Sequence, residues 1–404
     1  MEISMQIDKS TWTKVKLIDL VTKKEENDKE NARNRFDRFL KVEHLDAESL
    51  HVKRWGNIAD EELPPTFYKV FRKGQVLFPT RNPHLRRTAL ATFDGICGEK
   101  TLTLEPNIVK VLPQFLPFLF HSDAFYQHTT SAIVGSTNPH VRWRDVANYE
   151  FLLPPKDQQT KLAELLWAMD EVIEKDLRSL NKLTIKLDSD IENKLHGMSL
   201  NGYTINQVID KLSAKLKVEK LSKLGRIFKG KGIAKSETVD FGLPCVRYGE
   251  LYTKHHRLIK QCYSFINEES AENSIRLKKN DALIAGSGET IAEIGKSAVF
   301  ISDDEVYAGG DILIFRPHDM DGVYLGYLLN SQLVRQQLNK YGTGATVMHI
   351  YSSDIEKIKI PVIEKEEQIA IGQYFEMISN NISKLKDKIS NSKSLQKSLI
   401  NQIF

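Results

Sequence analysis

Two long stretches of the chain carry apolar residues at the spacing of an amphipathic helix. After Pro155 the apolar positions recur every three or four residues as far as Leu195, and after Pro361 a second series runs almost to Phe404. A single narrow stripe at this spacing is typical of a coiled-coil seam, which needs a partner helix to cover it. The pattern therefore predicts two helices of about 40 residues, each about 60 Å long at 1.5 Å per residue.

The two predicted helices span about 156–196 and about 364–404, and each is the simplest partner for the other. The first stripe consists of Leu162, Leu166, Met169, Ile173, Leu177, Leu180, Leu183, Leu187, Ile191 and Leu195. The second stripe consists of Ile371, Phe375, Ile378, Ile382, Leu385, Ile389, Leu395 and Leu399. Both helices follow equivalent segments, so an approximate twofold axis would pair them antiparallel, as a spacer between two domains.

The segments that lead into the two helices are similar without a gap. VRWRDVANYEFLLPPKDQQTKLAELL at 141–166 aligns with IYSSDIEKIKIPVIEKEEQIAIGQYF at 350–375, so each aligned pair is 209 residues apart. The likeness extends upstream to GSTNPHV, from Gly135, and GATVMHI, from Gly344. It includes a histidine in both copies, which we expect to organise the turn before the last strand.

Earlier segments repeat with slightly different offsets. KLIDL at 16–20 is similar to KLSKL at 220–224, an offset of 204 residues, and LEP ending at Pro106 is similar to FRP ending at Pro317, an offset of 211. Offsets that drift in this way are typical of a tandem duplication with small insertions in loops.

Each copy begins with strand-like apolar runs separated by turn residues, such as GQVLFPT in the first and DALIAGSG in the second. The expected fold class is therefore mixed α/β (α+β), with two pseudo-symmetric domains separated by an antiparallel pair of long helices. The expected boundaries are 1–154 and 201–362 for the domains, with 155–200 and 363–404 for the helical regions.

Composition agrees with two globular domains. The chain has 404 residues, and 57 Lys and Arg against 53 Asp and Glu leave a formal charge of +4, which permits a nucleic-acid partner without requiring one. Three widely separated cysteines, Cys97, Cys245 and Cys262, suit core thiols in a reducing cytoplasm. The N-terminal residues have no signal-peptide pattern and no window is apolar enough for a membrane span, so we expect a protein that is neither exported nor membrane-spanning.

These motifs resemble the specificity subunits of type I restriction-modification systems. The resemblance covers essentially the whole chain and is strongest in IKIPVIEKEEQIAIGQYF and in LSKLGRIFKGKGIAKSE, with YEFLLPPKDQQTKLAELL as the weaker first copy. It implies two target-recognition domains, each recognising one half of a split asymmetric sequence in double-stranded DNA, and helices that fix the gap. It also implies two methyltransferase (modification) subunits and restriction motor-nuclease subunits as partners, and no chemistry or cofactor in this chain.

The motifs of competing functions are incomplete. An adenine methyltransferase needs an Asn/Asp-Pro-Pro-aromatic motif and a glycine-rich cofactor loop, and the sequence has neither. This counts against a single-chain methyltransferase. TIAEIGKS at 290–297 lacks the first glycine of a phosphate-binding P-loop and precedes a strand-like run, which favours a loop-to-strand turn. His255-His256 has no further ligand at metal-binding spacing. A non-enzymatic scaffold with paired domains on a coiled-coil spacer remains the alternative.

Candidate DNA contacts are cationic side chains and flat donors in predicted loops. Arg86, Arg87 and Lys231 are favoured because nearby glycine or proline indicates exposed loops. The full set is Arg81, Arg86 and Arg87 in the first copy, and Lys229, Lys231, Arg247, Tyr248, Lys254, His256 and Arg257 in the second. The counterpart of the arginine loop, GSGETIAEIG, has two glutamates and no basic residue. Two domains that recognise different half-sites are expected to differ in this way.

Overall fold

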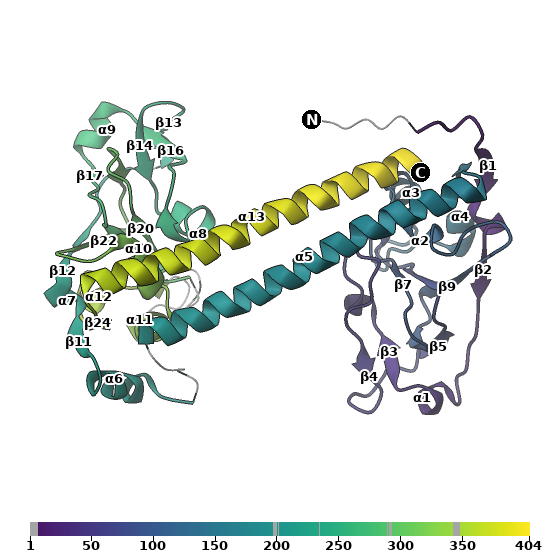
Figure 1. Ribbon diagram of the computed structural model, residues 1–404, viewed down its shortest axis with the longest axis horizontal. Helices are drawn as coiled ribbons and strands as arrows, with labels where there is room; N and C mark the ends of the chain where they lie inside the picture. Colours follow the sequence, from purple (N-terminus) through teal and green to yellow (C-terminus); the bar gives the residue numbers. More distant parts are fainter. Residues whose placement is uncertain are drawn as a thin grey trace. The chain divides into compact units, whose positions relative to one another are not determined.

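The computed structural model describes residues 7–196, 200, 202–233, 235–288, 290, 293–341 and 348–404. The chain divides into two compact units, which are coloured along the sequence in Figure 1. Unit 1 comprises Met1–Leu177 and Asp387–Phe404, and unit 2 comprises Arg178–Lys386. Gly197, which follows the first predicted helix, and Gly344 of the repeat lie outside the described residues.

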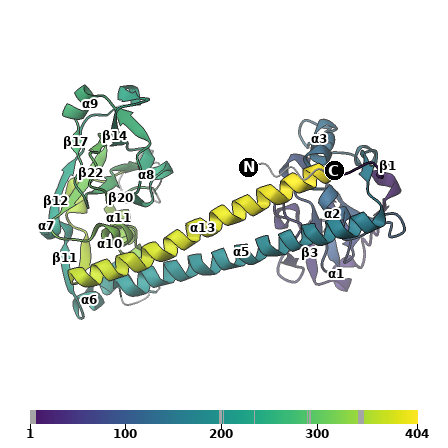
Figure 2. The ribbon, with the colours of Figure 1, turned by 45° about the horizontal axis from the view of Figure 1, so that its top comes forward.

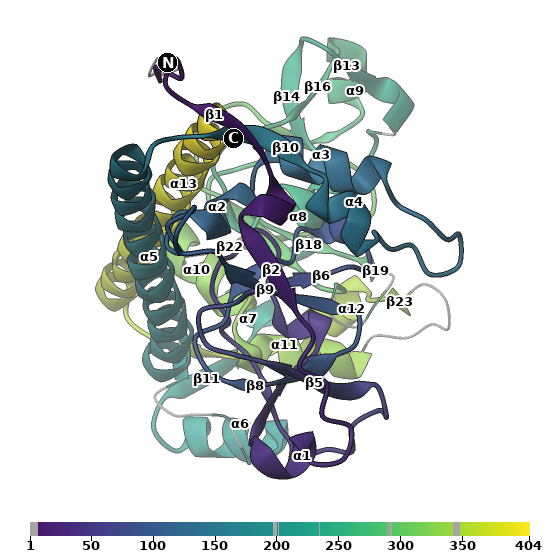
Figure 3. The same cartoon turned by 90° about the vertical axis from the view of Figure 1, so that its right-hand side faces the viewer.

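Unit 1 contains two four-stranded sheets and a two-stranded ribbon. The first sheet has the order β2-β9-β6-β7, of which β2, β9 and β6 are labelled in Figure 3. Its strands are β2 (Val21–Lys24), β9 (Thr101–Pro106), β6 (Val76–Pro79) and β7 (Ala89–Leu90). The second has the order β4-β3-β8-β5, with β4 (Gly56–Asn57), β3 (Arg38–Leu40), β8 (Gly95–Gly98) and β5 (Phe67–Phe71). The short helices are α1 (Ala32–Arg35), α2 (Leu116–Leu119), α3 (Asp123–Ser131) and α4 (Trp143–Ala147).

Unit 2 has two five-stranded sheets. The main sheet has the order β12-β22-β18-β20-β15, with β12 (Gly225–Lys229), β22 (Ile312–Pro317), β18 (Ala282–Ala285), β20 (Ser297–Phe300) and β15 (Arg257–Ile259). The other has the order β13-β16-β14-β21-β17, with β13 (Thr238–Val239), β16 (Ser264–Ile266), β14 (Leu243–Val246), β21 (Tyr307–Ala308) and β17 (Ile275–Arg276). A short ribbon pairs β19 (Ser287–Gly288) with β23 (Met348–His349).

The shorter helices of unit 2 flank these sheets, and α10 lies beside the start of the C-terminal helix α13 (Lys365–Ile403) in Figure 2. The ring centroids of Tyr327 in α10 and Phe375 in α13 are 4.9 Å apart. The helices are α6 (Ile205–Ser213), α7 (Leu221–Leu224), α8 (Glu250–Thr253), α9 (Glu268–Glu272), α10 (Gly322–Leu329), α11 (Gln332–Tyr341) and α12 (Ser352–Ile355).

Strand pairing confirms the duplication residue by residue. In unit 1, β1 (Thr13–Lys16) pairs antiparallel with β10 (Glu150–Leu153), and Thr13 faces Leu153. In unit 2, β11 (Lys217–Lys220) pairs antiparallel with β24 (Lys359–Val362), and Lys217 faces Val362. The sequence offsets of 204 and 209 residues therefore also relate the paired strands of one ribbon to those of the other.

The repeated glutamine fixes the start of each long helix. Gln159 has 1 % of its surface exposed; its side-chain oxygen accepts from the N–H of Leu112 at 2.8 Å, and its amide donates to the carbonyl of Pro154 at 2.9 Å. Gln368, 4 % exposed, makes the same two bonds to the equivalent backbone groups of Asp321 and Ile363, at 2.9 and 3.0 Å. Because both ends of each buried amide are satisfied by backbone groups, the glutamine ties the helix to two loops.

The long helices α5 (Lys156–His196) and α13 pair antiparallel inside each unit. In unit 1 the Asp176 carboxylate lies 2.9 Å from the Lys388 amine. In unit 2 the Tyr374 hydroxyl donates to Asp190 at 2.5 Å. The residue numbers therefore rise along one helix as they fall along the other. Among the described residues, no helix is both long enough and apolar enough to cross a membrane.

Many residues of the predicted seam are buried, whereas near the end of α13 the buried face differs from the predicted stripe. Leu187 and Ile191 pack in one core cluster of unit 2 with Phe375 and neighbouring seam residues. Near the C-terminus, Leu395 is 48 % exposed, whereas Ile400 and Ile403 are 5 % and 0 % exposed. These last turns also pack on the globular part of unit 1, where the rings of Phe404 and Phe115 lie 5.0 Å apart. A second packing partner changes which face is buried.

Candidate nucleic-acid interface

The ends of the strands in the main sheet of unit 2 bring distant loops to one edge. Lys229 at the end of β12 faces Leu313 near the start of β22, while Ala285 at the end of β18 faces Ile312. Ser297, at the start of β20, faces Ile284. We call this edge, with residues 229–233, 247–256, 286–288, 296–297 and 309–311, the loop edge of unit 2.

Most of the predicted DNA contacts of the second copy lie at this loop edge. Lys229 and Lys231 are exposed, and the Lys229 amine pairs with Asp311 at 3.1 Å. The Tyr248 hydroxyl donates to the carbonyl of Ser287 at 2.5 Å and so joins two of the loops. Arg247, Lys254 and His256 belong to the same set of loops. Their contact with DNA stays a prediction.

Arg257 differs from the other candidates because it is held by packing. Its guanidinium lies 4.9 Å from the ring centre of Tyr327 in α10, and its backbone has φ 65°. Its Nε is buried and has no hydrogen-bond partner among the described residues. Arg257 therefore contributes to the attachment of β15 to α10, and a role in DNA contact stays a prediction.

The equivalent edge of unit 1 is built on the same backbone bonds. The N–H of Val141 donates to the carbonyl of Thr80 at 3.0 Å, and at the equivalent place of the second copy the N–H of Ile350 donates to Gly286 at 2.8 Å. Arg81 bridges His140 at the place where Ser287 of unit 2 bridges His349. The arginine loop of unit 1 and the loop without a basic residue in unit 2 thus occupy equivalent places.

The repeated histidines lie in these bridges, and the ring of one of them also binds its own turn. His140 Nδ1 lies 3.0 Å from the carbonyl oxygen of Asn138. Arg81, whose backbone pairs with His140, is exposed. The expected turn-organising role is therefore met by this contact in unit 1.

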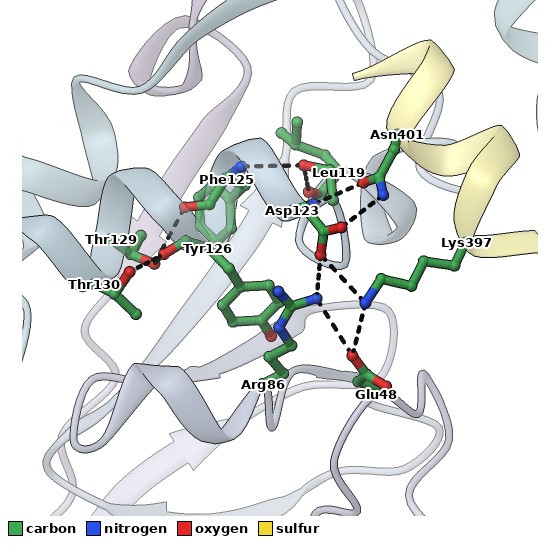
Figure 4. Close-up of polar contacts among 11 residues, drawn as sticks. Glu48, Arg86, Leu119, Asp123, Phe125, Tyr126, Thr129, Thr130, Lys397 and Asn401 are labelled. Carbon is green, nitrogen blue, oxygen red and sulfur yellow. Dashed lines mark hydrogen bonds and ion pairs between the residues drawn. The ribbon is translucent and has the colours of Figure 1, made fainter. Parts of the chain in front are cut away.

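Arg86 lies in an ion-pair cluster that the sequence did not indicate (Figure 4). Its Nη1 contacts Asp123 at 2.5 Å and Glu48 at 3.3 Å, and its guanidinium lies 4.8 Å from the ring centre of Tyr126. Lys397 of α13 lies 3.3 Å from Asp123 and 3.4 Å from Glu48. Although burial acts in the opposite direction, Arg86 holds the pKa of Asp123 below its ordinary value.

The cluster attaches the end of α13 to α3. Asn401 accepts a hydrogen bond from the N–H of Asp123 at 2.7 Å and donates to its carboxylate at 2.8 Å. Arg87, the second favoured arginine, donates to the carbonyl of Val42 at 3.1 Å. Both arginines are therefore held by contacts inside unit 1, and their contact with DNA stays a prediction.

Lys296 is a loop-edge residue that sequence reasoning missed. It belongs to the Gly-Lys-Ser triplet at the end of the incomplete P-loop motif. Residues 291–292 of that motif lie outside the described residues. β20 begins at Ser297, as a loop-to-strand turn requires. The Lys296 amine lies 5.6 Å from the ring centre of Tyr252. The triplet was a signal for a cationic loop, even though the nucleotide motif is incomplete.

The cysteines and acidic groups offer no metal site within the described ranges, where no group of three His, Cys, Asp or Glu could hold a metal ion. Cys97 and Cys245 are buried, and burial raises the pKa of each thiol to about 12. Such thiols stay protonated at neutral pH and are poor nucleophiles. They have the packing role that the sequence predicts.

Comparison with known proteins agrees with this architecture. The family model described as "Type I restriction modification DNA specificity domain" matches residues 9–184 and again 215–392. The chain belongs to this family. It is 26 % identical over 291 residues to the type I restriction enzyme MjaVIII specificity subunit of Methanocaldococcus jannaschii, covering 68 % of this chain and 67 % of the relative. It is 23 % identical over 352 residues to the MjaIX specificity subunit of the same organism, covering 80 % and 76 %.

Two solved structures share the fold of this specificity-family chain. The type I restriction-modification system S subunit from M. genitalium aligns with a TM-score of 0.61 at 15 % identity, covering 100 % of this chain and 98 % of that one. A chain from a study of assembly and conformational transition of the type I R-M system aligns with a TM-score of 0.57 at 20 % identity, covering 98 % and 97 %. The mixed α/β fold with two repeated domains and long helices is thereby confirmed.

Proposed function

We propose that this chain is the DNA-recognition subunit of a type I restriction-modification complex and that it recognises a split, asymmetric target. The globular part of each unit, within 1–154 and 201–362, recognises one half-site. The helical regions at 155–200 and 363–404 set the unspecified gap between the half-sites. The chain itself carries out no catalysis.

One observation carries the proposal: the loops at equivalent strand ends of the two units share the same backbone register but present different side chains. Arg81 in unit 1 occupies the place of Ser287 in unit 2, in equivalent backbone bridges. Base sequence is distinguished by donors and acceptors on side chains that reach the grooves, whereas the supporting frame only positions them. A shared register with divergent loops is the arrangement that two different half-sites require.

Membership of this family supports a proposal about the partner subunits that carry out methylation and cleavage. The curated relatives are named specificity subunits of type I restriction enzymes. We accordingly propose that two methyltransferase (modification) subunits bind this chain, and that restriction motor-nuclease subunits join them for cleavage. The complex would act on double-stranded DNA in the cytoplasm.

Exchange of one recognition domain tests the proposal. Replacing residues 218–362 by the same region of a related specificity subunit is expected to change one half of the methylated sequence and leave the other half and the gap unchanged. Methylome sequencing of a strain that carries the hybrid measures the result.

The matched control replaces residues 13–153 instead, and it should change only the other half. If either exchange altered both halves or neither, base recognition would not be local to the units and the proposal would fail.

A further inference from the structure

A pocket of about 150 Å³ opens at the loop edge of unit 2, beside the starts of β15 and β20. Tyr252, Lys254, His256 and Lys296 contribute to its wall, and Asn330 closes one side by donating to the carbonyl of Ser297 at 2.9 Å. The Tyr252 hydroxyl also donates to the carbonyl of Ser287, which connects the pocket with the loop after β18. The pocket therefore adjoins the predicted DNA contacts.

The described residues that line the pocket include two lysines and two histidines and no carboxylate. The amines of Lys254 and Lys296 lie 5.3 and 5.6 Å from the ring centres of Tyr263 and Tyr252, and no carboxylate of the described residues lies within ion-pair distance of either amine. Both positive charges are thus left without a counter-ion from the described part of the chain.

Burial lowers the pKa of both histidines of the wall, so neither supplies a positive charge at neutral pH. The side chain of His255 is 2 % exposed, and its Nε2, 4.0 Å from the Glu250 carboxylate, has no hydrogen-bond partner among the residues described. Partial burial lowers the pKa of His256 to about 4, and the nearby cations Arg257, Lys296 and Lys386 act in the same direction, whereas Asp188 acts in the opposite one. Lys254 and Lys296 are therefore the charged groups of the wall that can attract an anion.

Unit 1 has a pocket at the equivalent place with different chemistry. His121 lies 2.9 Å from the carbonyl of Thr88, in the place that the Asn330 to Ser297 bond occupies in unit 2. The wall of this pocket, of about 270 Å³, contains Glu48, Asp170, Lys393 and Lys397. Of its two lysines, Lys397 pairs with Glu48 at 3.4 Å. The unit 1 pocket therefore has two carboxylates beside its two lysines, whereas the described residues that line the unit 2 pocket include none.

We propose that the pocket of unit 2 binds one phosphate group of the DNA backbone, with Lys254 and Lys296 as its cationic contacts. The inference rests on the proposed DNA recognition and names the part of DNA that this site takes. A phosphate contact fixes the position and register of the domain on the duplex without contributing to base identity. The lysines would therefore strengthen binding equally for all sequences at the half-site of unit 2.

A phosphate scan with the assembled subunit and modification complex tests the inference. Duplexes carrying the methylated target receive a single neutral methylphosphonate at each position in turn. The wild-type complex should lose about five- to tenfold in affinity at 0.1 M salt for one position near one half-site. The Lys254→Ala/Lys296→Ala variant should bind unmodified DNA about five- to tenfold more weakly than the wild type does. A methylphosphonate at the responsive position should cause this variant no further loss of affinity. Its slope of log K against log salt should be shallower by about 0.9.

Two variants control the experiment. Lys223→Ala removes an exposed lysine from α7, at the opposite end of the strands of the same sheet, and should leave the slope and the scan unchanged. The Lys254→Arg/Lys296→Arg variant keeps both charges and should restore the wild-type scan.

The possible results separate this inference from the proposed function. Intact half-site selectivity with an unchanged scan and slope in the alanine variant would overturn the phosphate site alone. The same holds if inorganic phosphate binds the pocket while no methylphosphonate position responds, because the site would then take a free anion only. Absence of sequence-selective binding by the wild-type complex would overturn both.

Discussion

The equivalent pockets of the two units show how one backbone frame serves two purposes. In unit 1, Glu48 accepts ion pairs from Arg86 and from Lys397, so the position helps to hold the end of α13. In unit 2 the residue 206 positions later is Lys254, whose amine lies over the ring of Tyr263. The comparison teaches that the backbone register can stay the same in both units while the charge at one position is reversed. The position that holds α13 in unit 1 is thereby available to an anion in unit 2.

The same divergence occurs inside the sheets. Gln75 accepts a hydrogen bond from the N–H of Arg72 at 2.9 Å, and its counterpart Asp281 accepts one from the N–H of Lys278 at 2.8 Å. Only Asp281 also binds an arginine, Arg316, at 2.8 and 2.6 Å. The turn is thus preserved by either side chain, while unit 2 gains a bidentate ion pair.

The largest expected effect comes from this ion pair. Asp281→Ala should lower the free energy of unfolding of unit 2 by about 3 kcal/mol, because a fully buried carboxylate is lost and Arg316 is left partly buried without its partner. Gln75→Ala should cost unit 1 about 1 kcal/mol. Hydrogen exchange of the β18 and β6 amides measures the two losses, and equal losses would contradict the difference drawn between the turns.

The repeated glutamines should behave alike. Gln159→Ala and Gln368→Ala should each cost about 2 kcal/mol, because each leaves a backbone N–H and a carbonyl without a partner in the core. Urea unfolding with hydrogen exchange along the first turns of α5 and α13 measures the effect. The nearby Lys161→Ala, at an exposed position in α5, is the control for changes on the helix surface. Unequal losses would mean that the two helix starts are not equivalent.

Charge reversal at the equivalent pocket positions should give opposite results. Glu48→Lys should weaken the attachment of the last turns of α13 by about 1 kcal/mol, a modest figure because these ion pairs are partly exposed. Lys254→Glu should leave stability nearly unchanged and weaken DNA binding. Protection of the α13 amides and DNA titration of the complex measure these outcomes. A comparable loss of stability from Lys254→Glu would show that Lys254 also has a docking role.

The smallest effect concerns the end of α5. The Glu192 carboxylate accepts from the N–H of Gln332 at 3.1 Å, as Asn401 of α13 accepts from Asp123 in unit 1. Burial raises the pKa of Glu192 above its ordinary value. The folded state therefore binds the proton more tightly than the unfolded state, and the stability that Glu192 provides at low pH is lost as pH rises through its folded pKa.

Glu192→Gln keeps the hydrogen bond without the charge. The variant should be more stable than wild type by about 0.5 kcal/mol at pH 7, and the difference should vanish below about pH 4, where the carboxyl is protonated in both states. Urea unfolding of both proteins across this pH range measures it. A constant difference at every pH would mean that the effect does not come from ionisation.

The sequence by itself determined the large-scale organisation. The apolar stripes predicted helices at about 156–196 and 364–404, and the structure has them at Lys156–His196 and Lys365–Ile403. The offsets of the internal repeat predicted which strands are equivalent. Both signals are available without coordinates because helical periodicity is local and an internal repeat compares the chain with itself.

Only the tertiary structure decided what the individual side chains do. Arg86 appeared to be an exposed loop cation, but Glu48 and Asp123, 38 and 37 residues away in sequence, hold it in an ion-pair cluster. Lys296 was not among the predicted DNA contacts, but the starts of β15 and β20 place it beside Lys254 and His256. These partners are fixed by strand register and by the packing of α13, and a linear pattern contains neither distance nor direction across a sheet.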